Sequence, residues 1–220
     1  MPMRLRLFPL NAVLFPGAVL NLHVFEPRYK QMIHECMGEG VGFGVVLIRE
    51  GREAGDPSVE PHQVGSVAEI LEITQLPFDR FYISTIGRER FRITEIVSRE
   101  PYLTVEVEAI VEEAAGAEGL EPLTTQVRAA FLEYIELIIE FSGQEANVDL
   151  PDDPQSTSFI VGDALQVADT MKQRLLELDD TKQRLTVELA FLRRLLPQLR
   201  KLLERRDIEL EARRERGDEG

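Results

Sequence analysis

The segment from Phe8 to Tyr29 is FPLNAVLFPGAVLNLHVFEPRY, an apolar run that Pro9, Pro16 and Gly17 fold back on itself. Phe15-Pro16-Gly17 predicts a turn, because proline fixes φ at one turn position and glycine tolerates the positive φ that often follows. The next segment, Val19 to Phe25, is apolar nearly throughout, which predicts a strand buried on both faces or lying deep in a closed barrel. Glu26-Pro27 predicts the start of a helix, since proline suits the first helical position. This stretch contains no obvious catalytic group.

Alternating apolar residues surround this stretch and predict further strands. Leu5 and Leu7 alternate with arginines before it. After it, a helix is expected to begin at Pro27 and to end at Gly38. Strands are then expected over residues 43–48, 64–76, 81–96 and 102–110. Several successive strands with frequent turns and one early helix predict a small barrel or a pair of packed sheets.

The second half of the chain changes to helical periodicity after a small-residue, acidic linker that ends near Pro122. Helices are expected from Pro122 to Phe141, from Ser156 to Val167, from Asp169 or Thr170 to Leu178, and from Thr181 onward. Pro197 is expected to break or kink the last one. Strands followed by helices indicate an α+β chain. We therefore predict a β-rich lobe over residues 1–115, a helical bundle lobe over 116–205 and a charged tail over 206–220.

Composition limits the classes of function. The chain has 220 residues and a formal net charge of −14, which makes binding to a phosphate backbone unlikely because that affinity depends on lysine and arginine. The single cysteine, Cys36, allows no intrachain disulfide and fits a reducing cytoplasm. No span of about 20 apolar residues occurs, so no membrane helix is expected.

None of the sequence patterns that would indicate catalysis is complete. The glycines from Gly38 to Gly44 lack the lysine of a phosphate-binding loop. The three histidines have no metal-chelating spacing, and His23 is expected near the core. Arg88, Arg90 and Arg92 form a basic cluster best explained as a solvated strand face. We therefore expect no enzymatic activity, no catalytic residue, no cofactor and no metal.

Three segments near the N-terminus resemble the opening of the Lon protease N-terminal domain family: Leu7–Leu10, Val13–Gly17 and Leu22–Tyr29. The segment Ala168–Glu177, followed by Lys182–Leu185, is similar to that family's helical part. The resemblance implies a lobe like the PUA fold followed by a helical lobe. It also implies a stand-alone substrate-recognition domain, because the ATPase and protease modules of full-length Lon proteases would have to follow Gly220.

By this resemblance the protein is expected to be a non-enzymatic polypeptide-binding module and an adaptor in protein quality control. Its expected partners are unfolded or damaged polypeptides, with a Lon-type protease as a further candidate partner. The residues selected for contact are Phe15, Pro16, Phe78 and Phe81, on loops at one end of the barrel; the competing interpretation places the three aromatic rings in the core.

Two other classes of function stay open. Proteins with a PUA-like fold also occur among RNA-modifying proteins, so a nucleic-acid-associated module is the main alternative, although the net charge opposes it. A structural adaptor is the third interpretation, in which the leucines after Thr181 pair with a second chain. Packing within the lobe explains the same leucines.

Overall fold

The computed structural model describes residues 3–53, 58–112, 120–143 and 148–215. Contacts divide the chain into two units. The first unit holds Met1–Glu113 together with Phe159–Asp179, and the second holds Ala114–Ser158 together with Asp180–Gly220. The boundary predicted near Gly116 lies outside the described residues, and the predicted domain limits stay a prediction. Phe159–Asp179, assigned from sequence to the helical lobe, makes its contacts with the strands.

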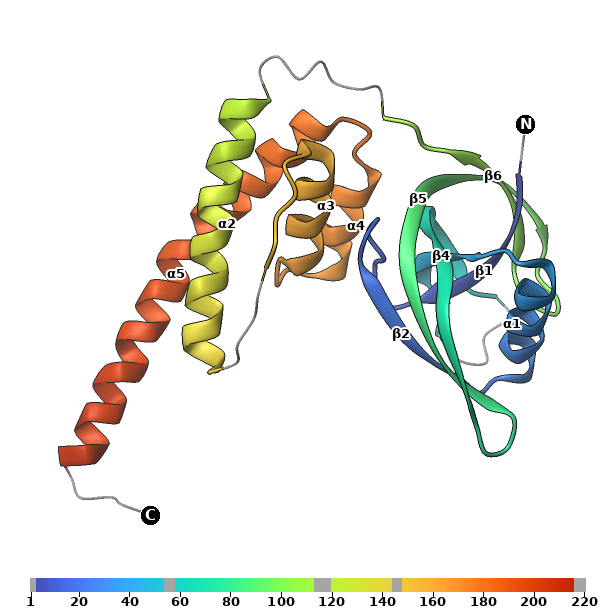
Figure 1. The fold of residues 1–220 in the computed structure, drawn as a ribbon, viewed down its shortest axis with the longest axis horizontal. Helices are drawn as coiled ribbons and strands as arrows, with labels where there is room; N and C mark the ends of the chain where they lie inside the picture. Colours follow the sequence, from blue (N-terminus) through green and yellow to red (C-terminus); the bar gives the residue numbers. More distant parts are fainter. Residues whose placement is uncertain (1–2, 54–57, 113–119, 144–147, 216–220) are drawn as a thin grey trace. The chain divides into compact units, whose positions relative to one another are not determined.

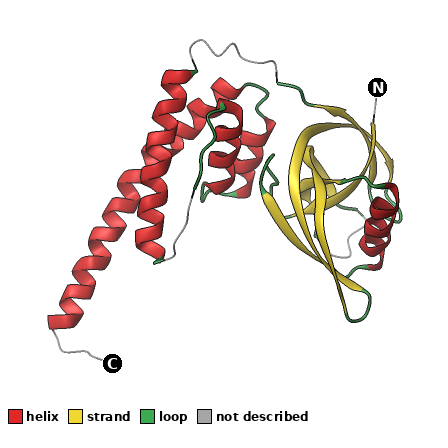
Figure 2. Cartoon of the chain, viewed as in Figure 1, coloured by secondary structure: helices red, strands yellow, loops and turns green. Residues whose placement is uncertain are grey.

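The α+β class predicted from sequence is confirmed (Figures 1 and 2). The strands are β1 (Met3–Leu10), β2 (Val19–Val24), β3 (Phe43–Glu50), β4 (Glu60–Leu76), β5 (Arg80–Ser98) and β6 (Thr104–Ala109). The helices are α1 (Pro27–Glu39), α2 (Glu121–Ser142), α3 (Pro154–Ala164), α4 (Asp169–Glu177) and α5 (Thr181–Glu215).

The six strands form one sheet in the order β2-β5-β4-β3-β1-β6, and β5 also pairs with β6. This extra pairing closes the sheet into a barrel, visible as the rolled sheet in Figure 2. The long β5 makes closure possible because β2 pairs with its first half, Phe81 to Ile86, and β6 with its second half, Phe91 to Ser98. Strand β2 therefore lies at the end of the sheet. Strand β5 pairs with one of its edges, and no described strand pairs with the other.

The core of the first unit lies on both faces of β1. Phe8 and Leu10 belong to a cluster with the buried face of α1, whereas Leu5 and Leu7 belong to a second cluster with residues of β6. Because successive side chains of a strand point to opposite faces, β1 separates the two clusters. Burial on both faces was predicted for residues 19–25. The structure shows it instead for Leu7–Leu10 of β1.

Strand β2 is half exposed, so the prediction that it is buried on both faces was wrong. Leu20, Leu22 and Val24 face the core, while Val19 and His23 are exposed. The cause is the alternation of side chains along the strand: Leu20, Leu22 and Val24 point to the core, so Val19 and His23 point to the opposite face. The expected core position of His23 was wrong for the same reason.

The predicted turn at Phe15-Pro16-Gly17 is present and rests on Gly87 of β5. Gly17 has φ of 82°, and its N–H donates to the Gly87 carbonyl at 2.8 Å. A Cβ added to Gly87 would lie 2.1 Å from the Phe15 carbonyl oxygen. The close approach of the turn to β5 therefore requires a glycine at position 87.

Helix α1 begins at Pro27, as predicted, and ends at Glu39 with Gly40 in the left-handed conformation. It buries Tyr29, Met32, Ile33 and Cys36 at helical spacing. Its exposed side is tied to β1, because Arg6 donates to Glu39 at 2.6 Å and to Glu35 at 3.3 Å. The early helix is thus fastened to the first strand by both apolar and ionic contacts.

Within the first unit, hydrogen bonds connect helix α4 to strands β4 and β5. The Gln173 side chain donates to the Val64 carbonyl of β4 at 3.0 Å. Arg90 is 3% exposed and donates to the Leu176 and Leu178 carbonyls at 2.5 and 2.7 Å. The prediction of a solvated arginine face was wrong at this position, because carbonyls at the end of α4 take the place of water.

The second unit contains the packed pair α2 and α5. Between the start of α3 and α5, Ser158 donates to Glu188 and accepts from Arg184, both at 2.7 Å. Helix α5 continues through the exposed Pro197 to Glu215, so the helix does not end at this proline, and a kink there stays a prediction. In the predicted tail, Arg206 donates to the Glu140 carbonyl of α2 at 2.6 Å.

Candidate functional site

The four residues selected from sequence do not form one surface. Phe15 and Phe81 are buried in the first unit, and Pro16 is half-buried. Phe78 is 88% exposed at the tip of the β4–β5 hairpin, where Phe78 and Asp79 both have positive φ. Burial removes Phe15 and Phe81 from contact with a partner in this conformation, so Phe78 and the half-buried Pro16 stay as candidate contacts.

A different group of rings lies on the outer face of β2 and β5, which we call the outer aromatic cluster: His23, Phe25 and Tyr82. The His23 ring lies 5.7 Å from that of Phe25 and 6.1 Å from that of Tyr82, centroid to centroid. Phe25 and Tyr82 are 54% and 53% exposed. The strand register places His23 directly opposite Tyr82. Sequence analysis missed this cluster, although the period-2 spacing of His23 and Phe25 could have indicated it.

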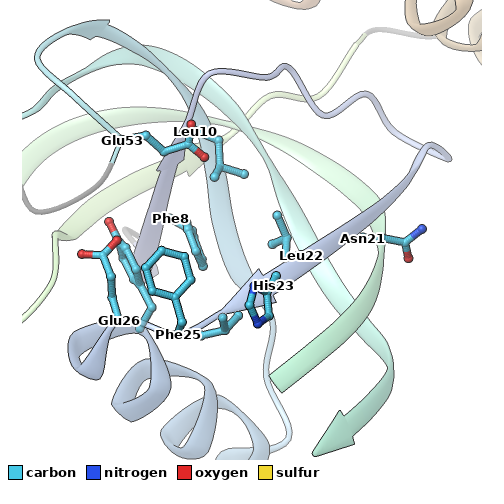
Figure 3. A pocket seen from close by; sticks show the side chains of 10 residues that line it. Phe8, Leu10, Asn21, Leu22, His23, Phe25, Glu26 and Glu53 are labelled. Atoms are coloured by element: carbon cyan, nitrogen blue, oxygen red, sulfur yellow. The ribbon is translucent and has the colours of Figure 1, made fainter. Parts of the chain in front are cut away.

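A pocket of about 320 Å³ lies between β1 and β2, and we call it the β1–β2 pocket (Figure 3). Phe8 and Leu10 of β1 line it, together with the successive residues Asn21 to Phe25, as Figure 3 shows. Glu26 and Glu53 complete the wall and rim. The pocket is thus apolar on its floor and carries carboxylates at its edge.

Hydrogen bonds hold both carboxylates. Arg28 donates to Glu26 at 3.1 Å, and the Asn11 side-chain amide donates to Glu53 at 3.0 Å. Burial raises the pKa of the Tyr29 hydroxyl to about 12; Arg28 opposes this rise, while Glu26 and Glu53 add to it. The carboxylates of Glu26 and Glu53 therefore act on the same part of the pocket.

The arginines of β5 do not present a basic face. Arg88 donates to Glu69 at 2.6 Å and Arg92 donates to Asp179 at 3.0 Å. The hydrogen bond from Arg88 holds the pKa of the Glu69 carboxyl below its ordinary value. Arg90 is buried, as described above, so these three residues leave little positive charge for a phosphate backbone.

The described residues offer little for catalysis. Among them, no group of three or more His, Cys, Asp and Glu side chains is arranged to hold a metal ion. Cys36 is fully buried, and burial raises the pKa of its thiol to about 11, so the thiolate form is scarce at neutral pH. Within the same described ranges, no helix is both long enough and apolar enough to cross a membrane.

Comparison with known proteins accounts for this combination of barrel and helices. Residues 4–194 match the model of the ATP-dependent protease La (LON) substrate-binding domain. The chain belongs to the Lon substrate-binding domain family. The resemblance inferred from the segments around Phe8 to Tyr29 is thereby confirmed.

Relatives and solved structures agree with this assignment. The chain is 30% identical to a Lon protease of Flavobacterium johnsoniae over 97% of this chain and 26% of that protein, and 29% identical to Lon protease 2 of Myxococcus xanthus over 88% and 24%. It spans about a quarter of the length of these relatives. The crystal structure of a Lon N-terminal domain protein from Xanthomonas campestris matches with a TM-score of 0.63 and 26% identity, covering 86% of this chain and 98% of that one.

The N-terminal domain of a Mycobacterium avium complex Lon protease has the same fold, with a TM-score of 0.65 at 20% identity over 86% of this chain and 98% of that one. The matched segments of these relatives are the substrate-binding part of the family and not its protease part. The barrel and the helices after it are therefore the fold of a Lon substrate-binding domain.

Proposed function

We propose that this protein recognises unfolded or damaged polypeptides without catalysing a reaction, and that it serves protein quality control in the cytoplasm as an adaptor for a Lon-type protease. Membership of the Lon substrate-binding domain family supports the substrate class. The single observation that carries the proposal on this chain is the outer aromatic cluster, exposed beside the open edge of a strand.

The mechanism is weak capture with broad specificity. Phe25 and Tyr82 offer rigid apolar rings, which bury large areas at a low cost in side-chain entropy. Among the described residues, no strand pairs with the edge of β2 that β5 leaves open, and an extended segment can add to such an edge through main-chain hydrogen bonds. Main-chain pairing does not depend on the partner's sequence, so different unfolded chains are accepted. A folded protein has its strands paired already and is rejected.

Binding to one protein in two folding states tests this proposal. Lysozyme held unfolded by reduction and neutral alkylation is compared with native lysozyme, which has nearly the same charge. Fluorescence anisotropy is expected to show saturable binding of the unfolded form and at least about tenfold weaker binding of the native form, a difference of about 1.4 kcal/mol. Equal binding of the two forms, or binding of neither, would overturn the proposal.

A further inference from the structure

The β1–β2 pocket shares His23 and Phe25 with the outer aromatic cluster and adds two kinds of surface that the cluster lacks. Phe8, Leu10 and Leu22 supply apolar walls, and Glu26 and Glu53 supply carboxylates. The Phe8 wall is rigid because its ring stacks on Tyr29 with centroids 4.0 Å apart. A volume of about 320 Å³ lies at the lower end of the range for ligand sites and suits a single long side chain.

The pocket runs along the open edge of β2. Five successive residues, Asn21 to Phe25, line it, although successive side chains of a strand point to opposite faces. A pocket that touches residues of both faces must reach the backbone edge between them. Because β5 occupies the other edge of β2, the pocket lies on the edge that no described strand pairs. An extended segment at this edge would direct alternate side chains toward the pocket.

The charge of the pocket is negative. Its lining contains the carboxylates of Glu26 and Glu53 and, among the described residues, no lysine or arginine. Arg28 partly compensates Glu26 through their 3.1 Å contact. The contact between Glu53 and the Asn11 amide is with a neutral group, so it leaves the charge of Glu53 in place. At the Tyr29 hydroxyl, Arg28 lowers the pKa while Glu26 and Glu53 raise it, so the negative charge that favours a cation in the pocket is mainly that of Glu53.

We propose that the β1–β2 pocket takes the side chain of a lysine or arginine from an extended polypeptide that pairs with the open edge of β2. The methylene stem packs against Phe8 and Leu22, and the charged end reaches Glu53 and Glu26. A cation hydrogen-bonded to a carboxylate forms one of the stronger polar contacts in proteins. The inference rests on the proposed function and narrows it: the preferred segments are apolar and carry a basic residue.

Three fluorescein-labelled peptides test the preference. They share one apolar, extended sequence and carry lysine, norleucine or glutamate at the central position, so the lysine and norleucine peptides differ only in the charged end group. The wild-type protein is expected to bind the lysine peptide about tenfold more tightly than the norleucine peptide, and the glutamate peptide most weakly. The preference is expected to shrink as ionic strength rises.

Two variants assign the preference to the pocket. Glu53→Gln keeps an oxygen for the Asn11 amide and removes the charge, so we expect it to bring the lysine peptide close to the norleucine peptide while norleucine binding stays unchanged. Glu89→Gln changes the net charge equally at an exposed residue of β5 outside the pocket lining, and is expected to keep the preference. Thermal unfolding checks that both variants fold, and Glu26→Gln provides a second test within the pocket.

The outcomes separate this inference from the proposed function. Equal binding of the lysine and norleucine peptides by the wild type would overturn the inference and leave polypeptide recognition standing. An equal loss of preference in Glu53→Gln and Glu89→Gln would assign the preference to net charge and also overturn it. If unfolded lysozyme and all three peptides failed to bind, both proposals would fall.

Discussion

Two aromatic groups in the first unit have similar chemistry and opposite surroundings. Phe8, Tyr29 and Phe43 form a buried group in which the Phe8 ring lies 4.0 Å from Tyr29 and 6.0 Å from Phe43. The outer aromatic cluster of His23, Phe25 and Tyr82 has similar spacings but is exposed. Apolar chemistry alone therefore does not separate a core ring from an exposed ring; the face of the sheet on which the ring lies does, since Phe81 is buried and its neighbour Tyr82 is exposed on the same strand.

The largest effect on stability is expected in the buried group. Phe8→Ala removes a ring that packs against Tyr29 and Phe43 and leaves a cavity. We expect the free energy of unfolding to fall by about 3–5 kcal/mol. Urea denaturation followed by circular dichroism measures it, and a loss below about 1 kcal/mol would contradict a core position for this ring.

A smaller effect is expected at Gly87, which allows the Phe15-Pro16-Gly17 turn to approach β5. Gly87→Ala would place a Cβ 2.1 Å from the Phe15 carbonyl oxygen, so backbone must shift. We expect a loss of about 1–3 kcal/mol in the free energy of unfolding. Gly38→Ala is the control, because a Cβ there meets no atom within 4 Å. Equal stability of both variants would show that the turn does not depend on this glycine.

Acid is expected to weaken the attachment of α1 beside the buried group. The Tyr102 hydroxyl donates to Glu35, and this hydrogen bond, with others from Gln31 and Arg6, holds the pKa of the Glu35 carboxyl below its ordinary value. A depressed pKa stabilises the fold above the unfolded-state pKa of about 4.3, and this contribution is lost as pH falls through the folded-state value. Glu35→Gln should therefore reduce the difference in unfolding midpoint between pH 7 and pH 3. An unchanged difference would contradict the coupling.

The smallest effect on stability is expected in the outer aromatic cluster. Phe25→Ser and Tyr82→Ser change half-exposed rings, so each should alter the free energy of unfolding by at most about 0.5–1 kcal/mol. The same denaturation experiment as for Phe8→Ala measures the change. A loss comparable to that of Phe8→Ala would mean that the exposed rings stabilise the fold as much as the buried rings do.

The sequence was sufficient for much of the fold. The turn at Gly17, the helix start at Pro27 and the order of strands before helices all follow from local patterns. The exposure of one face of β2 was missed, although Asn21 and His23 alternate with Leu20, Leu22 and Val24 in the period-2 pattern of a half-exposed strand. The burial of Arg90 depends on carbonyls 86 and 88 residues farther along the chain.

The candidate site was predicted less well. Aromatic residues near turns favoured Phe15 and Phe81, yet both rings point into the core of the first unit. The exposed partners His23 and Tyr82 meet only through the register of β2 with β5, a long-range pairing that local periodicity does not contain. Phe78 is exposed, which leaves it accessible, and its role in binding stays a proposal.

Binding of unfolded lysozyme to the double variant Phe25→Ser/Tyr82→Ser tests the role of the outer aromatic cluster most directly. The matched control is Phe141→Ser in the second unit, since Phe141 is 49% exposed and so resembles Phe25 and Tyr82 in exposure. We expect the dissociation constant to rise at least about tenfold in the double variant and to stay unchanged in the control, with both proteins folded. An unchanged dissociation constant in the double variant would contradict the assignment of polypeptide capture to this surface.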